Sequence, residues 1–191
     1  MDQQAIIEAI AQNETIENRD LSGVDLSGAD LGGGRFENVV FAHADFRKAQ
    51  ITRTGFKKCT FAGARFDDTD LTQVDFREMD VSGASFKGAL LHKTLLDRAD
   101  LSACDFTGAK ISWSLMQAAN LGQAVFLRAE FERSILQHAD CTAADFSEAV
   151  LFKTIFLDAA LSRSVFRGAA LHKVLLAGCD LAGQDFSGMR F

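Results

Sequence analysis

An apolar residue at every fifth position constrains the fold of this 191-residue chain more than any other feature. The register begins at Ile16 and runs without a break to Phe191, which makes 36 consecutive apolar positions. Of these, 16 are Phe, 14 are Leu and three are Ile. A period of five matches neither an amphipathic helix nor an alternating strand. The chain is therefore one short unit repeated many times, and we call the apolar residue the centre of each pentad.

The other positions of the pentad are also restricted in residue type. Two residues before the centre the side chain is usually small, with 16 Ala. Asp occurs 13 times directly before the centre, and 11 of the 15 Gly stand two residues after it. This pattern predicts that each pentad directs one large and one small side chain inward. A turn that often contains Gly then leads to the next pentad.

Pentads such as ADLGG (29–33), ADLSA (99–103) and ADFSE (144–148) resemble the pentapeptide-repeat family. The resemblance covers residues 16–191. It implies an all-β fold, a right-handed quadrilateral β-helix with four pentads per coil and about nine coils.

Residues 20 apart share their character, which supports a four-sided coil independently of the resemblance. We name the walls A, B, C and D for the pentads whose centres begin at residues 16, 21, 26 and 31 and recur every 20 residues. The centres of wall C are Leu26 followed by eight Phe, and those of wall D are aliphatic except Phe131 and Phe191. One aromatic and one aliphatic ladder would fill a narrow interior. The absence of proline suits coils that hydrogen-bond to one another throughout.

The two ends of the coil stack need protection from edge pairing. Residues 1–15 are expected to form a cap with a helix over 2–13, for which Asp2 is the N-cap. Ile6, Ile7 and Ile10 are expected to cover the first coil. Residues 16–191 form the β-helix, whose far edge at Phe191 is either exposed or paired with a second copy.

The sequence predicts no enzyme activity, no cofactor and no metal site. His92 and His172 lie on one wall but four coils, or about 19 Å, apart, which is too far to share a metal ion. The cysteines are interpreted as small buried side chains without disulfides, since all fall on inward positions: Cys59, Cys104, Cys141 and Cys179.

Net charge and hydropathy limit the classes of partner that the chain can bind. The net charge of −6 argues against direct binding of nucleic acid. No long apolar window or basic leader is present, so we expect no membrane contact and a cytoplasmic protein. The family resemblance implies that it is bacterial.

Outward residues directly before the centres lean acidic on walls B and C. They are Asp80, Asp100, Asp140 and Asp180 on wall B, and Asp105, Asp145 and Asp185 on wall C. Two interpretations stay open: the aspartates support turns through local backbone bonds, or they imitate the charge of DNA. The family resemblance bears on both, because Asp is common at this position throughout the family, and some quinolone-resistance members resemble B-form DNA and bind DNA gyrase. This chain departs from those members in having neither a C-terminal dimerisation helix nor projecting loops.

Wall A is different in the C-terminal half of the chain. Its outward residues form an uninterrupted set that we call the apolar column: Leu95, Leu115, Ile135, Ile155 and Leu175. Two residues earlier in each coil stands a set that we call the cationic edge: Lys93, Trp113, Arg133, Lys153 and Lys173. An apolar surface of this extent indicates an interface, although Leu and Ile also favour strand surfaces.

These patterns predict a non-catalytic scaffold that binds a protein through its outer walls. The partner is another protein of unknown identity, or a second copy joined through the C-terminal edge or the apolar column. One alternative is a DNA-mimicking binder of DNA gyrase or another type II topoisomerase. Another is a bacterial secretion-associated protein, which rests on family analogy alone.

Overall fold

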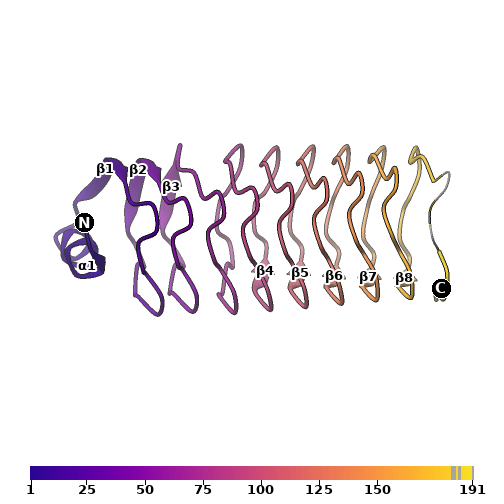
Figure 1. Ribbon diagram of the computed structural model, residues 1–191, viewed down its shortest axis with the longest axis horizontal. Coiled ribbons are helices and arrows are strands. Elements are labelled where there is room, and N and C mark those ends of the chain that lie inside the picture. Colours follow the sequence, from indigo (N-terminus) through magenta and orange to yellow (C-terminus); the bar gives the residue numbers. More distant parts are fainter. Residues whose placement is uncertain (182–183, 185, 191) are drawn as a thin grey trace.

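The chain winds into a parallel β-solenoid with one short helix at its N-terminal end (Figure 1). The computed structural model describes residues 1–181, 184 and 186–190. Bridged residues of neighbouring coils are 20 apart throughout, as in Asp80 with Asp100. Eight complete coils therefore span residues 16–175, and the following residues begin the ninth. The predicted fold class is confirmed.

Helix α1 (Gln3–Ala11) packs against the first coil. The Asp2 side chain accepts the Ala5 amide at 3.0 Å, so the predicted N-cap forms. Ile6 is fully buried, and Ile7 and Ile10 pack against the core while remaining partly exposed. The predicted helix is therefore present, but it is shorter than the range 2–13.

Gly34 makes room for this helix at a small inward position of wall A. A Cβ atom there would lie 2.9 Å from the Leu31 carbonyl oxygen and 3.0 Å from the Ile10 Cδ1 atom. The first distance is shorter than real Cβ contacts, and the second is tighter than most of them. The glycine is thus required by packing at the junction of cap and coil.

Regular strands occur on two walls in two different halves of the solenoid. On wall A, a three-stranded parallel sheet comprises β1 (Thr15–Asp20), β2 (Arg35–Val40) and β3 (Gly55–Lys57). On wall D, a five-stranded parallel sheet comprises β4 (Leu90–His92), β5 (Lys110–Ser112), β6 (Glu130–Glu132), β7 (Val150–Phe152) and β8 (Ala170–His172). Isolated parallel bridges hold the other faces together.

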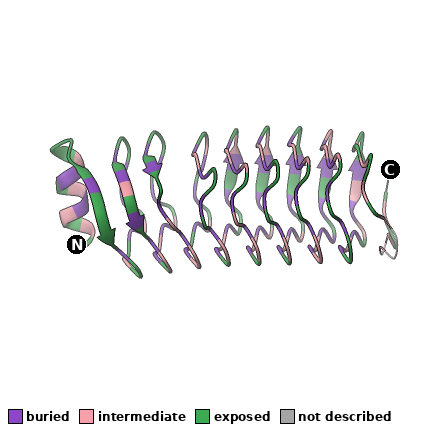
Figure 2. Ribbon diagram, turned by 90° about the horizontal axis from the view of Figure 1, so that it is seen from above, coloured by how far each residue is buried: buried purple, intermediate pink, exposed green. Residues whose placement is uncertain are grey.

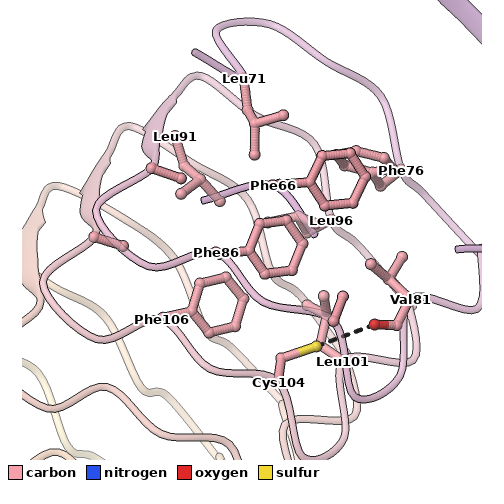
Figure 3. Close-up of a cluster of buried hydrophobic side chains, with 14 of the residues drawn as sticks. Phe66, Leu71, Phe76, Val81, Phe86, Leu91, Leu96, Leu101, Cys104 and Phe106 are labelled. Atoms are coloured by element: carbon pink, nitrogen blue, oxygen red, sulfur yellow. Dashed lines mark hydrogen bonds between the residues drawn. The ribbon is translucent and has the colours of Figure 1, made fainter. Parts of the chain in front are cut away.

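The pentad centres form the core, and side chains of one wall stack from coil to coil. Figure 2 shows buried segments recurring at the same place in successive coils, and Figure 3 shows Phe66, Phe86 and Phe106 as one ladder. From Phe86 to Phe166 the ring centroids of wall C are 4.7 to 4.9 Å apart, with planes within 8° of parallel. This spacing is the rise per coil and agrees with the usual distance between β-strands.

The corners all use the same backbone conformation. The residue two after the centre has a φ between 52° and 79° in every described pentad. Glycine was the expected residue there, yet 24 of these residues are not glycine. A left-handed residue other than glycine costs about 1–2 kcal/mol, so the stacked coils impose the conformation on whatever residue stands there. Corner side chains can therefore vary without changing the fold.

Candidate protein-binding surface on walls A and D

The apolar column is continuous in space. Leu95 is bridged to Leu115 and the pairing continues through Ile135 and Ile155 to Leu175. Leu175 is 45% exposed, whereas the other four side chains are half-buried. The sequence-predicted residues are thus brought together, but they are less exposed than their outward positions suggested.

The cationic edge runs beside the column, at the corner between walls D and A. Its five residues are the left-handed corner residues of successive coils, with φ from 52° to 56°. Trp113 is 46% exposed, and the Arg133 guanidinium carbon lies 4.6 Å from the centroid of its ring. The Lys153 ammonium lies 5.1 Å from the ring centroid of Phe152. Cation–π contacts therefore hold the middle of the edge.

A ladder of buried hydroxyl groups separates the edge from the column. The ladder consists of Thr94, Ser114, Ser134 and Thr154, and all four are fully buried. The Thr154 hydroxyl alone among them has no hydrogen-bond partner within the described residues. Ser114 Oγ donates to the Leu91 carbonyl at 2.8 Å and accepts the Thr94 amide at 3.2 Å. The Ser114 amide in turn donates to Ser134 Oγ at 3.3 Å.

At the Thr94 and Ser114 amides, this ladder replaces a turn bond that most other corners make. At the next corner, for example, the Ala99 amide donates to the carbonyl of the centre Leu96 at 3.1 Å. The Thr94 amide uses a hydroxyl of the following coil instead. Sequence reasoning classed these hydroxyl residues only as small, and so missed their role. The signal was the run of Ser and Thr on wall A, where the other walls carry mostly Ala.

Wall D extends the surface and adds positive charge. The wall D segments beside the column contain five basic and two acidic residues, a net charge of +3 in a chain whose net charge is −6. These segments are residues 90–93, 110–113, 130–133, 150–153 and 170–173. Lys93, Lys110, Lys153 and Lys173 have no carboxylate within 4.0 Å among the described residues. The Arg133 Nε atom lies 3.8 Å from the Glu132 Oε1 atom.

Apolar side chains on wall D continue the patch. Leu90 and Val150 are 39% and 42% exposed. Together with Lys110, Glu130 and Phe152, they border a shallow open depression of about 650 Å³. The apolar column therefore belongs to a larger surface that turns the corner between two walls.

The aspartates of walls B and C are engaged in their own turns. The carboxylate of Asp100 accepts the Ser102 amide at 3.0 Å, and the same bond recurs at eleven of the 13 aspartates that precede a centre. These eleven include Asp80, Asp105, Asp140 and Asp145. Asp180 has interactions of its own, and Asp185 lies outside the described residues. Five of the seven predicted acids therefore support their own turns.

Cysteine and histidine side chains form hydrogen-bond contacts between neighbouring coils, as at Cys104 and His92. Cys104 Sγ donates to the Val81 carbonyl at 3.1 Å (Figure 3), and burial raises the pKa of this thiol to about 12. His92 Nδ1 lies 2.8 Å from Ser112 Oγ. Within the described part of the chain, no three His, Cys, Asp or Glu side chains gather to hold a metal ion, and no helix is long and apolar enough to cross a membrane.

Comparison with known proteins gives family matches over most of the chain. Residues 29–106 match a model described as a pentapeptide repeat region, and residues 114–151 and 144–183 match one described as pentapeptide repeats (8 copies). No curated protein matches the chain.

Among solved structures, the chain is similar to HetL, a pentapeptide repeat protein involved in heterocyst differentiation regulation from Nostoc sp. strain PCC 7120. The TM-score is 0.84 at 21% identity, over 100% of this chain and 94% of HetL. Full-length QnrB1, a plasmid-mediated fluoroquinolone resistance protein, gives a TM-score of 0.49 at 22% identity, over 92% of each chain. The similarity to HetL shows a shared fold, whereas the value for QnrB1 is too low to support an argument.

Proposed function

Because the chain belongs to the pentapeptide-repeat family, we propose that it is a non-catalytic scaffold that binds another protein through the apolar column and the cationic edge. One observation carries this proposal. Five aliphatic side chains are stacked without interruption on one outer wall, at the pentad position that elsewhere is most often Asp. Contiguous apolar surface of this kind is typical of interaction sites.

The composition of the surface also supports an interface. Trp and Arg are the residues that most often dominate binding energy at protein interfaces. Trp113 and Arg133 are stacked on each other at the border of the column. The aliphatic column supplies apolar area beside them, and the lysines at both ends of the edge supply a polar rim.

The alternative of gyrase binding depends on the acidic walls. Those aspartates are bonded to their own backbone amides, so their presence needs no partner. A supercoiling assay separates the two functions. The scaffold proposal expects no inhibition or protection of DNA gyrase, and inhibition that survives loss of the apolar column would place the function on walls B and C instead.

The direct test substitutes the middle of the column. We expect Ile135→Asp and Ile155→Asp to abolish capture of a partner by the tagged chain from host lysate. Val165→Asp is the matched control, because Val165 occupies the same pentad position on wall C, next to Asp145. Equal capture by the column variants, the control and the unmodified chain would refute the assignment of binding to wall A.

A further inference from the structure

We propose that the segment covering the apolar column is an acidic amphipathic α-helix of the partner, lying parallel to the solenoid axis. This inference rests on the proposed function, since it concerns the same surface. It follows from three properties of that surface: its hydrogen bonding, its spacing and its charge.

The backbone of wall A is already fully engaged by neighbouring coils. The Leu95 amide donates to the Val74 carbonyl at 3.0 Å, and the Leu95 carbonyl is bonded to the Phe76 amide at 2.8 Å. The Leu115 amide likewise donates to the Thr94 carbonyl at 3.1 Å. A partner therefore cannot add a strand here, as peptides do at open sheet edges. A helix satisfies its own backbone and binds through side chains alone.

The spacing of the column matches a helix better than an extended chain. Its side chains recur once per coil, and the phenylalanine ladder sets that rise at 4.7 to 4.9 Å in the same coils. A helix presents one face every 5.4 Å, so the mismatch is about 0.6 Å per turn. Alternate residues of a strand lie about 6.6 Å apart and lose register by almost 2 Å at each step.

The length of the column sets the length of the partner helix. From Leu95 to Leu175 there are four coil steps, about 19 Å at the usual strand spacing. A helix covers that distance in about 13 residues, with one apolar residue per turn facing the column.

The charge of the surface is different on the two flanks of the column. On the wall D side lies the face of net +3, whose four lysines have no carboxylate partner among the described residues. On the other flank the residues directly after the wall A centres are neutral or acidic, as at Asp97, Gln117 and Gln137. The one Lys or Arg at the next corner of these coils, Arg98, is paired with Glu78 at 3.2 Å. The helix should therefore carry Asp or Glu along one side only, next to its apolar stripe.

The test uses two stapled, fluorescein-labelled 18-residue helical peptides and the full chain. Both peptides carry one Leu per turn; the flanking stripe is Glu in one and Lys in the other. Fluorescence anisotropy should show binding of the Glu peptide, at least tenfold tighter than that of the Lys peptide. Raising NaCl from 50 to 500 mM should weaken it at least fivefold, because exposed charges are screened.

Three variants connect the binding to the proposed surface. Ile135→Asp should weaken the Glu peptide at least tenfold, and the double variant Lys153→Glu, Lys173→Glu should weaken it by at least fivefold. Val165→Asp should change the affinity less than twofold. Thermal melts identify any variant that fails to fold, and the lysine variants, which alter only surface side chains, keep the test decisive.

The inference is overturned if the Glu peptide does not bind, if the Lys peptide binds as well, or if Val165→Asp weakens binding as much as Ile135→Asp. The proposed function is judged separately. Suppose that the Glu peptide fails but Ile135→Asp still abolishes capture of a protein, or halves the mass measured by light scattering. The column is then an interface covered by another kind of segment or by a second copy. If Ile135→Asp alters neither, both proposals fail.

Discussion

The Ser114 hydroxyl holds the corner that carries Trp113 on one side and Leu115 on the other. It donates to the Leu91 carbonyl at 2.8 Å and accepts the Thr94 amide at 3.2 Å. Ser114 is fully buried, so no bulk water can take over these bonds in the Ser114→Ala variant. A buried amide left without an acceptor costs about 1–3 kcal/mol.

Part of this cost can be recovered by a change of corner geometry. If the corner tightens, the Thr94 amide can reach the Leu91 carbonyl, as the Ala99 amide reaches the Leu96 carbonyl at 3.1 Å. We therefore expect Ser114→Ala to lower the free energy of unfolding by about 1–2 kcal/mol. Urea denaturation measures this change, and hydrogen exchange at the Thr94 amide reports whether its bond is lost.

Trp113 is the only tryptophan of the chain, so its emission reports directly on this corner. Ser114→Ala should shift the emission, whereas Ser102→Ala should not, because the Ser102 hydroxyl makes no hydrogen bond within the described residues. The control should also change stability by less than about 0.5 kcal/mol. The reasoning is refuted if both variants are equally stable and exchange at Thr94 is unchanged.

Three further predictions concern the core, the cap and pH. Phe106→Ala should cost about 3–5 kcal/mol in urea denaturation, because the buried ring is stacked at 4.7 and 4.8 Å between two others; a cost below 1 kcal/mol would contradict the ladder. Gly34→Ala should cost about 1–3 kcal/mol by pushing Ile10 of α1 off the first coil, whereas Gly55→Ala, whose Cβ would meet nothing nearer than 3.9 Å, should be neutral or stabilising. The hydrogen bond from Arg47 lowers the pKa of Asp45, so its contribution to stability is present above the unfolded pKa of about 3.9 and is lost as the pH falls through the folded pKa. Asp45→Asn should thus be less stable than the unmodified chain at pH 7, and a difference that persists undiminished at pH 2 would rule out this origin.

The fold was predictable because one register dictates every coil. The centres from Leu21 to Leu171 are buried, and the bridges join residues 20 apart, as the repeat requires. Each coil contacts its neighbours in the same way, so a correct interpretation of one pentad applies to all of them. The left-handed corners were predicted only where Gly stands, because the conformation at residues such as Arg133 comes from stacking and not from local preference.

The candidate surface was predictable in its membership but not in its detail. Periodicity places Leu95 and Ile135 on one wall, and it places Trp113 and Arg133 on one corner. It does not show that the aliphatic side chains before Leu175 are half-buried, since that depends on side-chain packing. Nor does it distinguish a small Ala from Ser114, whose hydroxyl matters only once the carbonyl of the preceding coil is in place.

The turns of wall A support the proposal that a partner covers the apolar column. On walls B and C an Asp before the centre bonds to its turn, as Asp100 does to the Ser102 amide. With Leu95 or Ile135 at the same position, the turn still closes. The Ala99 amide donates to the Leu96 carbonyl at 3.1 Å, and the Ala139 amide donates to the Leu136 carbonyl at 3.2 Å. The fold therefore accepts either a carboxylate or an aliphatic side chain there. Strand preference can account for single aliphatic residues, as at Val125, but not for five aligned on one wall. Exposing such a column to water is unfavourable, and the proposed partner would offset that cost by covering it.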